Sequence, residues 1–278
     1  MSNFAWLRPL GNGRARTAPA QPRCRPQLEA LEDRTVPSAV GTPNQNFVDQ
    51  LYRDLLHRVP DPGGLAGWSQ ALDSGRLTRQ EVALNIRGSD EGLGVQVNDL
   101  YVRFLRRSAS PAEQNGWKPF LSDHSTEDLE ERILASQEYF SVEGGGTVNG
   151  WLNSVYLDVL CRPIGAGEVG FWSSRAGTGS EGRLGVAEDI VESHEARTDE
   201  IKGFYTAYLR RPADPGGLDF WTRLLESGDA DKGVNNDHVP KSVEDNDDAI
   251  IVADILSSTE YFQDSQVLAT FATIPTCM

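Results

Sequence analysis

The residues of this 278-residue sequence best suited to binding an ion are the acids of residues 228–248. This segment contains seven acids and two lysines, and Asp229, Asp231 and Asp237 have the spacing of ligands in a calcium loop, because Ca²⁺ prefers carboxylate oxygens. An EF-hand is not matched, since glycine holds the fifth position counted from Asp229 and Pro240 holds the twelfth. Two interpretations stay open: a solvated acidic loop, and a weak Ca²⁺ site that calorimetric titration would detect.

Side chains typical of catalysis are scattered. The sequence has no His-Glu-x-x-His motif, no phosphate-binding Gly-x4-Gly-Lys loop and no Gly-x-Ser-x-Gly nucleophile turn; its four histidines are His57, His124, His194 and His238. The three cysteines are too far apart in sequence to indicate a Cys-x-x-Cys metal site. We therefore predict a protein that is not an enzyme and has no cofactor beyond the Ca²⁺ considered above. A hydrolase with a site assembled between lobes is the catalytic alternative.

Four residue types recur with fixed spacing and divide the chain into four copies of one unit. Each copy has a tyrosine, an arginine six residues later, a tryptophan ten residues after the arginine, and a downstream glutamate in a Ser-x-Glu triplet. The sets are Tyr52, Arg58, Trp68 and Glu91 in copy one; Tyr101, Arg107, Trp117 and Glu138 in copy two; Tyr156, Arg162, Trp172 and Glu195 in copy three; and Tyr205, Arg211, Trp221 and Glu260 in copy four. This recurrence predicts an internal repeat.

Both structural and functional roles are open to these residues. Every copy with the arginine also has the glutamate, so we predict an ion pair between them in each copy, with a helix-end carbonyl as the alternative partner. A bound carboxylate or phosphate is the functional alternative for the arginine. The tryptophans share an apolar stripe with leucines, so we predict that they pack in the core rather than stack on sugars. The residue before each arginine varies (His57, Arg106, Cys161 and Arg210), which favours an exposed position.

The elements that position these residues are expected to be short helices, three in each copy. In copy one Leu51 and Leu55 share a face of the first helix, Asp61-Pro62 is an N-cap signature for the second, and Thr78-x-x-Glu81 is a capping box for the third. Alternating apolar and polar residues, which would indicate strands, are nearly absent. The sequence therefore predicts an all-α protein.

The copies are expected to pack in pairs, because a three-helix unit of this size has too small a core to stand alone. We predict two lobes: residues 46–142 with copies one and two, and residues 150–262 with copies three and four. A glycine-rich segment at 143–147 separates them, and residues 263–278 are expected to be a C-terminal tail.

The first 45 residues are rich in arginine and proline and are expected to form a disordered tail. Within this tail, residues 28–38 (LEALEDRTVPS) resemble a segment found near the start of many bacterial surface or exported proteins. That resemblance implies a targeting role and an extracellular or cell-envelope location. No run approaches the roughly 18 apolar residues that a membrane-spanning helix needs.

The pattern from Leu51 to Trp68, and nearly as well that from Phe204 to Trp221, resembles a bacterial repeat domain of unknown function, number forty-two fourteen. The resemblance covers about residues 46–262. Copy two departs from the pattern at Glu113 and Gln114, and copy three lacks the Asp-Pro turn. Members of that family are similar to the rod-linker domain of phycobilisomes, a helical protein–protein adaptor, and often accompany calcium-binding repeats in secreted proteins.

The charge restricts the partners. The chain has 41 acidic and 26 basic residues, a net charge of −15. Residues 1–38 hold six arginines and three acids, so residues 39–278 hold 20 basic and 38 acidic residues, a net charge of −18, and binding to nucleic acid is not expected. We predict a non-catalytic surface or secreted module that mediates protein–protein or matrix contact, with a protein or envelope component as its partner and its oligomeric state open. The alternative is a module that binds carbohydrate or an envelope polymer through Ca²⁺ held by the acidic segment 228–248.

Overall fold

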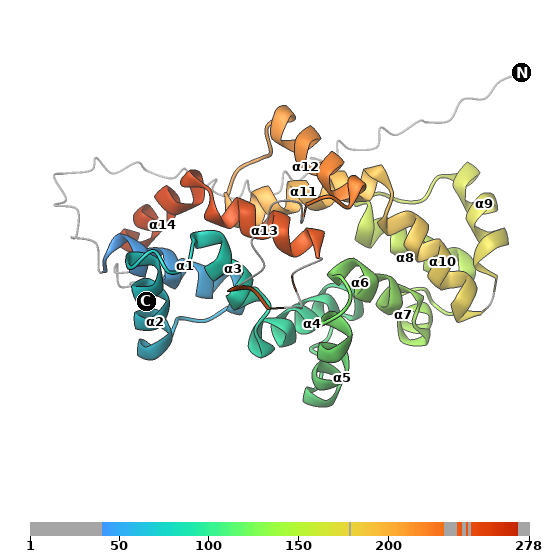
Figure 1. Cartoon of the computed structure of the whole chain (residues 1–278). Coiled ribbons are helices and arrows are strands. Elements are labelled where there is room, and N and C mark those ends of the chain that lie inside the picture. Colours follow the sequence, from blue (N-terminus) through green and yellow to red (C-terminus); the bar gives the residue numbers. More distant parts are fainter. Residues whose placement is uncertain (1–40, 178, 231–237, 241–242, 244–245, 272–278) are drawn as a thin grey trace, which may run out of the picture. The chain divides into compact units, whose positions relative to one another are not determined.

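The computed structural model describes residues 41–177, 179–230, 238–240, 243 and 246–271. Within these residues the chain forms fourteen α-helices and no strand, which confirms the predicted all-α fold (Figure 1). The helices are α1 (Pro43–Leu56), α2 (Pro62–Asp73), α3 (Arg79–Arg87), α4 (Asp90–Leu105), α5 (Pro111–Leu121), α6 (Thr126–Ala135), α7 (Gln137–Val142), α8 (Val148–Val159), α9 (Ala166–Ala176), α10 (Ser180–Val191), α11 (His194–Tyr208), α12 (Pro215–Ser227), α13 (Asp247–Ser257) and α14 (Thr259–Phe271).

The second helices of copies one and four begin at the predicted Asp-Pro caps. At the start of α2, Asp61 accepts hydrogen bonds from the backbone N–H groups of Gly63 and Gly64 at 3.0 and 2.9 Å. At the start of α12, Asp214 accepts one from Gly217 at 2.9 Å. Proline follows both aspartates at the first helical position, where its missing N–H is no loss.

Other helix starts also follow the sequence. The capping boxes at Thr78 and Ser110 are present at the starts of α3 and α5. Copy three has the weaker start that its glycines predict, because Gly165 offers no capping side chain to α9. Glu168 compensates in part by accepting a hydrogen bond from the backbone N–H of Gly165 at 2.9 Å.

The Ser-x-Glu triplets stand at the starts of helices. Their serines accept a hydrogen bond from the backbone N–H three residues later, as N-cap residues do; these serines are Ser89, Ser136, Ser193 and Ser258. The helices begun at Ser89 and Ser193 run on into the next copy, so α4 has 16 residues and α11 has 15. After copy two, Gly145 and Gly146 adopt positive φ and separate α7 from α8.

Each first helix ends in the same left-handed turn. The residue before the repeated arginine has φ of 51–55° in every copy, and these residues are His57, Arg106, Cys161 and Arg210. All four side chains are exposed, as their interchange predicts. The repeated arginine therefore directly follows this turn in every copy.

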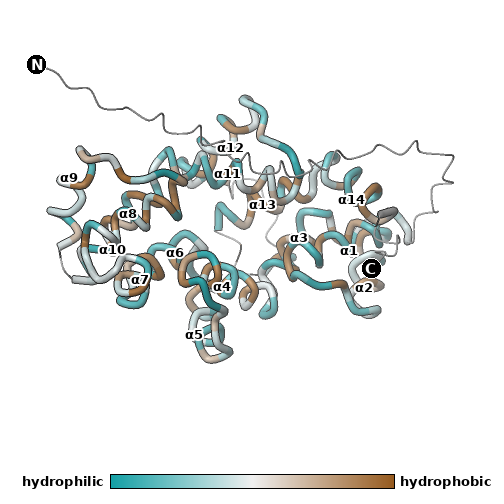
Figure 2. Tube along the Cα trace, turned by 180° about the vertical axis from the view of Figure 1, so that it is seen from behind, coloured by the Kyte–Doolittle hydropathy of each residue, from teal (hydrophilic) through white to brown (hydrophobic). Residues whose placement is uncertain are grey.

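The pairing of the copies differs from the predicted lobes. One core is built from copy one (α1–α3) and copy four (α11–α13), and it joins residues such as Leu51, Leu84 and Ile251. The other is built from copy two (α4–α6) and copy three (α8–α10), and it includes Leu134 and Trp151. Figure 2 shows brown apolar segments alternating with teal ones along the helices, as expected of helices that each bury one face.

The physical reason for this pairing lies in the third helices and in the long first helices. α3 packs on α13, and α6 packs on α10, so each third helix covers the apolar face of a third helix from another copy. The buried side chains of α4 belong to the core of copies two and three, although the helix begins beside copy one. α11 returns the chain to the core of copies one and four. Its Ala196 lies in the core of copies two and three, and its Ile201 lies in the core of copies one and four.

Two equivalent polar clusters join the paired copies. Asp54 of copy one accepts a hydrogen bond from the hydroxyl of Tyr261 at 2.8 Å and pairs with Arg210 of copy four at 3.1 Å. Asp158 of copy three likewise accepts a hydrogen bond from the hydroxyl of Tyr139, at 2.9 Å, and pairs with Arg106 of copy two. The two pairs of copies are therefore built on one plan.

The predicted C-terminal tail is partly helical. α14 extends to Phe271, and the ring of Phe262 lies 6.0 Å from that of Phe47 in α1. Gln266 accepts a hydrogen bond from the side chain of Asn46 at 3.0 Å. These contacts with α1 give the segment a surface to pack on, which a tail prediction overlooks. Residues 1–40, where the targeting prediction falls, lie outside the described residues, and no helix among those described is long and apolar enough to span a membrane.

Candidate functional site

The repeated tyrosine and tryptophan lie side by side at the junction of the first and second helices. In copies one to three the indole Nε1–H donates to the tyrosine hydroxyl: Trp68 to Tyr52 at 3.1 Å, Trp117 to Tyr101 at 2.8 Å, and Trp172 to Tyr156 at 2.6 Å. The tyrosines are buried, whereas the tryptophans are only half-buried and pack on the edges of the two cores. The tryptophans therefore pack against the cores, as predicted, but they are less buried than core residues.

The predicted ion pairs form in all four copies. The Nη2 of the arginine lies within hydrogen-bond distance of the glutamate Oε2 in Arg58–Glu91 (2.7 Å), Arg107–Glu138 (2.8 Å), Arg162–Glu195 (2.9 Å) and Arg211–Glu260 (2.8 Å). Each guanidinium also lies over its tyrosine ring, with 4.9–5.1 Å between the arginine Cζ and the ring centroid. The pairs tie the end of one helix to the start of another, a structural role.

Copies two and three add a second glutamate to this cluster. Glu113 and Glu168 occupy the place that Gly64 and Gly217 hold in copies one and four. The hydrogen bonds from Arg107 lower the pKa of Glu113 to about 2, and those from Arg162 do the same for Glu168. The departures of the middle copies from the repeat pattern therefore extend the arginine cluster instead of disrupting it.

Close contacts with the tyrosine explain why copies one and four have glycine at this position. A Cβ at Gly217 would lie 2.2 Å from the hydroxyl of Tyr205, and one at Gly64 would lie 2.5 Å from that of Tyr52. Both distances are shorter than Cβ contacts found in proteins, so the tyrosine hydroxyl approaches the helix backbone closely only where the residue is glycine.

A double-mutant cycle on Arg107 and Glu138 is expected to give a coupling free energy of about 0.5–1 kcal/mol, since the pair is half-exposed but bidentate. The matched control is the Arg223–Asp219 pair, which lies on the surface of α12 and should couple by no more than about 0.3–0.5 kcal/mol. Urea unfolding of the single and double variants measures both values. Equal couplings would show that the repeated pair is only a surface contact.

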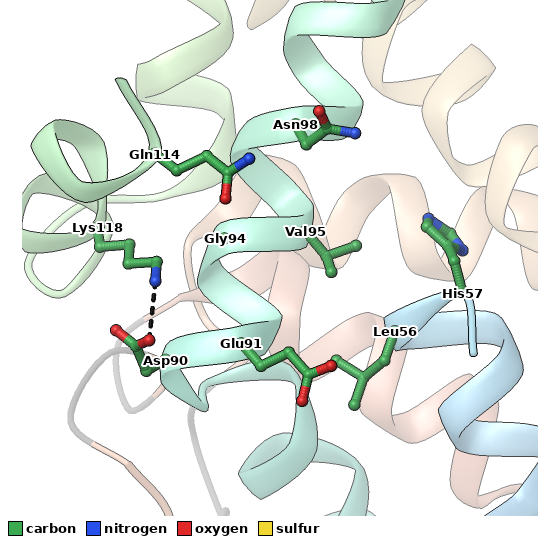
Figure 3. Close-up of a pocket in the computed structure, with 9 residues that line it drawn as sticks. All are labelled: Leu56, His57, Asp90, Glu91, Gly94, Val95, Asn98, Gln114 and Lys118. Carbon is green, nitrogen blue, oxygen red and sulfur yellow. Dashed lines mark hydrogen bonds and ion pairs between the residues drawn. The ribbon is translucent and has the colours of Figure 1, made fainter. Parts of the chain in front are cut away.

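A polar pocket of about 520 Å³ lies beside α4, between the end of α1 and α5 (Figure 3). Lys118 on one side forms an ion pair with Asp90 at 2.8 Å, and His57 lies on the other side. His57 is hydrogen-bonded to Asp99 at 2.8 Å, and this bond raises the pKa of the imidazole. Because the charged side chains of the pocket pair within the protein, it presents little unbalanced charge to a ligand.

The predicted calcium ligands fall largely outside the described residues. Asp231 and Asp237 lie in the segment 231–237, and Asp229 is described but half-buried at its edge. Nearby, Asp247 accepts a hydrogen bond from the backbone N–H of Ala230 at 3.0 Å. The Ca²⁺ loop thus stays a prediction.

The structure brings together an acidic cluster that the sequence spacing does not predict, although one member, Asp248, ends the acidic segment 228–248. Glu127 of α6, Glu200 of α11 and Asp248 of α13 each place a carboxylate oxygen within 4.8 Å of the other two. Asp248 is 2% exposed. One signal was available: Glu200 precedes Phe204 by four residues, which puts a glutamate on the side of the helix that also carries apolar residues.

Burial and mutual repulsion govern the charge of this cluster. Burial, and next the charge of Asp248, raise the pKa of Glu127 to about 8. Burial is also the main cause of the raised pKa of Glu200 and of Asp248. Partial compensation comes from Arg197, which lies 3.3 Å from Glu127, and from Arg103, which lies 3.5 Å from the neighbouring Glu130.

A separate carboxylate of α6 gives a pH prediction. Glu131 is buried, and this burial, with repulsion from Asp128 and from Glu192, raises its pKa from 4.5 to about 8. Between these values the folded state holds a proton that the unfolded chain releases, so stability falls as the pH rises, by up to about 1.4 kcal/mol per pH unit. Urea unfolding at pH 5.5, 6.5 and 7.5 should show this decrease.

The Glu131→Gln variant should lose part of the slope and gain stability at pH 7.5. The exposed Glu181→Gln variant serves as the control and should keep the slope of the unmodified chain. An unchanged slope in Glu131→Gln would show that Glu131 is ionised in the folded state.

Comparison with known proteins gives one match, over part of the chain. No curated protein and no solved structure matches the sequence. One family model matches residues 36–96, a stretch that contains the Tyr52, Arg58, Trp68 and Glu91 cluster of copy one. The family is described as Domain of unknown function (DUF4214), and residues 36–96 are similar to it.

Proposed function

We propose that the protein is a non-catalytic module that mediates protein–protein or matrix contact, and that α9 and α12 carry the contact. The observation that supports this is a pair of exposed aromatic residues at equivalent positions. Phe171 and Phe220 directly precede the repeated tryptophans and are 56% and 57% exposed. Each packs edge-on against its tryptophan, with ring centroids 4.7 and 4.9 Å apart.

These aromatic pairs lie on helices that have few buried residues. Ala176 is the buried residue of α9, and Thr222 and Leu225 are those of α12, so both helices present most of their surface to solvent. Covering a phenylalanine side chain stabilises a complex by roughly 1.5–3 kcal/mol, and aromatic residues are enriched at the centres of protein interfaces. The net charge of −15 favours a partner with a neutral or basic contact surface.

Site-specific photo-crosslinking tests this function. A benzoylphenylalanine is placed at position 171 or 220 of the full chain, and at position 142 as the control, because Val142 is 68% exposed but lies outside α9 and α12. After irradiation in an extract of the source cells, positions 171 and 220 should give the same crosslinked protein and position 142 should not. The absence of adducts, or identical adducts at all three positions, would contradict the proposed contact surface.

The proposed location is extracellular or at the cell envelope, and it is supported by the sequence of residues 28–38. A reporter fused after residues 1–45 should then leave the cytoplasm. A fusion with residues 28–38 scrambled should stay inside, and equal export of both fusions would contradict a targeting role for the segment.

A further inference from the structure

We propose that Glu127, Glu200 and Asp248 bind a hard divalent cation, with Ca²⁺ or Mn²⁺ as the fitting class of ion, between α6, α11 and α13. This site is distinct from the predicted loop of Asp229, Asp231 and Asp237, although Asp248 is the last residue of the acidic segment 228–248. Carboxylate oxygens are the ligands that such ions prefer. With metal–oxygen distances of about 2.3–2.6 Å, ligands on opposite sides of Ca²⁺ lie up to about 5 Å apart. The three carboxylate oxygens, all within 4.8 Å of one another, satisfy this limit.

An unpartnered oxygen gives independent support. The Oδ2 atom of Asp248 accepts a hydrogen bond from the hydroxyl of Thr126 at 2.9 Å. Its Oδ1 atom is fully buried and has no hydrogen-bond partner among the residues that the structure describes. Buried carboxylate oxygens are nearly always paired, because leaving one without a partner costs free energy. A cation in the cluster would satisfy this oxygen.

Glu200 is also free to bind. Within the described residues its carboxylate makes no hydrogen bond or ion pair, and the charged groups that face it are Asp248, Glu127, Glu130 and Arg103. A cavity of about 210 Å³ adjoins the cluster and is lined by Glu127, Glu200 and Thr126 among other residues. This cavity provides access for an ion and room for the water molecules that would complete its coordination.

The neighbouring arginines leave the cluster acidic. Arg197 contacts Glu127 alone among the three proposed ligands, and Arg103 contacts Glu130. In the described part of the chain, Asp248 and Glu200 therefore have no arginine within ion-pair distance, although the charges of Arg87 and Arg197 act on Asp248 and that of Arg103 acts on Glu200. Protons are the competing occupants, and the experiment below separates them from a metal ion.

A bound ion would link the two cores. α6 contributes Leu129 and Ile133 to the core of copies two and three. α11 and α13 contribute Ile201 and Ile250 to the core of copies one and four. A ligand that binds only the folded protein stabilises it by mass action, so ion binding here should raise the unfolding temperature.

The test measures thermal unfolding and calorimetric titration of the full chain after treatment with EDTA, with CaCl₂ and MnCl₂ as separate probes. At an ion concentration about 100-fold above Kd, the midpoint of unfolding should rise by roughly 5 °C or more. The Asp248→Asn and Glu200→Gln variants should lose this rise and bind at least about tenfold more weakly. Both substitutions remove buried charge, so both variants should remain folded, which circular dichroism verifies.

Two controls identify the site. Glu131→Gln changes another buried carboxylate of α6, and the triple variant Asp229→Asn, Asp231→Asn, Asp237→Asn removes the three predicted loop ligands; both should keep the rise. The proposal fails if neither ion raises the midpoint of the unmodified chain, which leaves protons as the occupants. It also fails if Asp248→Asn keeps the rise, or if the triple variant alone loses it.

Discussion

Replacing Trp151 with alanine is expected to lower the free energy of unfolding by about 3–5 kcal/mol, because the side chain is completely buried in the core of copies two and three. Its indole Nε1–H donates to the backbone carbonyl of Leu134 at 2.8 Å, so α8 is bonded to α6 as well as packed near it. The substitution leaves a cavity and an unsatisfied carbonyl together.

Urea unfolding measures this loss, and two further variants make it specific. Trp151→Phe removes the hydrogen bond but keeps most of the volume, so it should cost less than the alanine variant. Phe171→Ala removes an exposed ring and should change stability by no more than about 0.5 kcal/mol. A loss at Trp151 no larger than that at Phe171 would mean that residue 151 is not in a packed core.

Replacing Ile251 with alanine is expected to cost about 2–5 kcal/mol and to loosen a segment that lies far away in sequence. Ile251 is fully buried in α13, which packs on α3. Hydrogen exchange should therefore show the largest loss of protection in α1, α3 and α13. The helices α8 to α10, which precede α13 more closely in the chain, should be affected less.

The matched control is Ile190→Ala, a substitution in α10 at a residue buried in the other core. It should loosen α6 and α8 and leave α1 protected, the reverse of the Ile251 pattern. If Ile251→Ala instead loosened α8 to α10 and left α1 protected, the pairing of copy one with copy four would be wrong.

Local structure was the most predictable part of this chain, because local structure depends on neighbouring residues. The Asp61-Pro62 cap and the Thr78-x-x-Glu81 box act within one helical turn, so their spacing alone was sufficient. The ion pair of Arg58 with Glu91 spans more residues, yet its fourfold recurrence revealed it.

The pairing of copies was not predictable in the same way. Packing copy one on copy two assumed that neighbours in sequence share a core. That assumption fails because two continuous helices cross from one core to the other. The buried apolar side chains of α4 belong to the core of copies two and three, and α11 runs from that core at Ala196 into the core of copies one and four at Ile201. A Ser-x-Glu triplet looks alike whether it ends a unit or caps a new helix, so the sequence alone did not distinguish the two.

The acidic cluster was hidden for a related reason. Glu127 lies in the first turn of α6 and Asp248 in the first turn of α13, where acids are ordinary because they favour the positive end of the helix dipole. Nothing in their spacing links them to Glu200. They meet through the packing of helices from three separate regions of the chain, which sequence patterns do not encode.

The contact of α14 with α1 has a consequence for how such arrays grow. In an open solenoid each terminal repeat has a free face, and further repeats can be appended there. Here α14 lies against α1, and Phe47 and Tyr261 meet edge to face with ring centroids 6.0 Å apart. The quartet is thus a closed ring in its order of contacts, and a fifth copy would have to break this seam instead of stacking on an end.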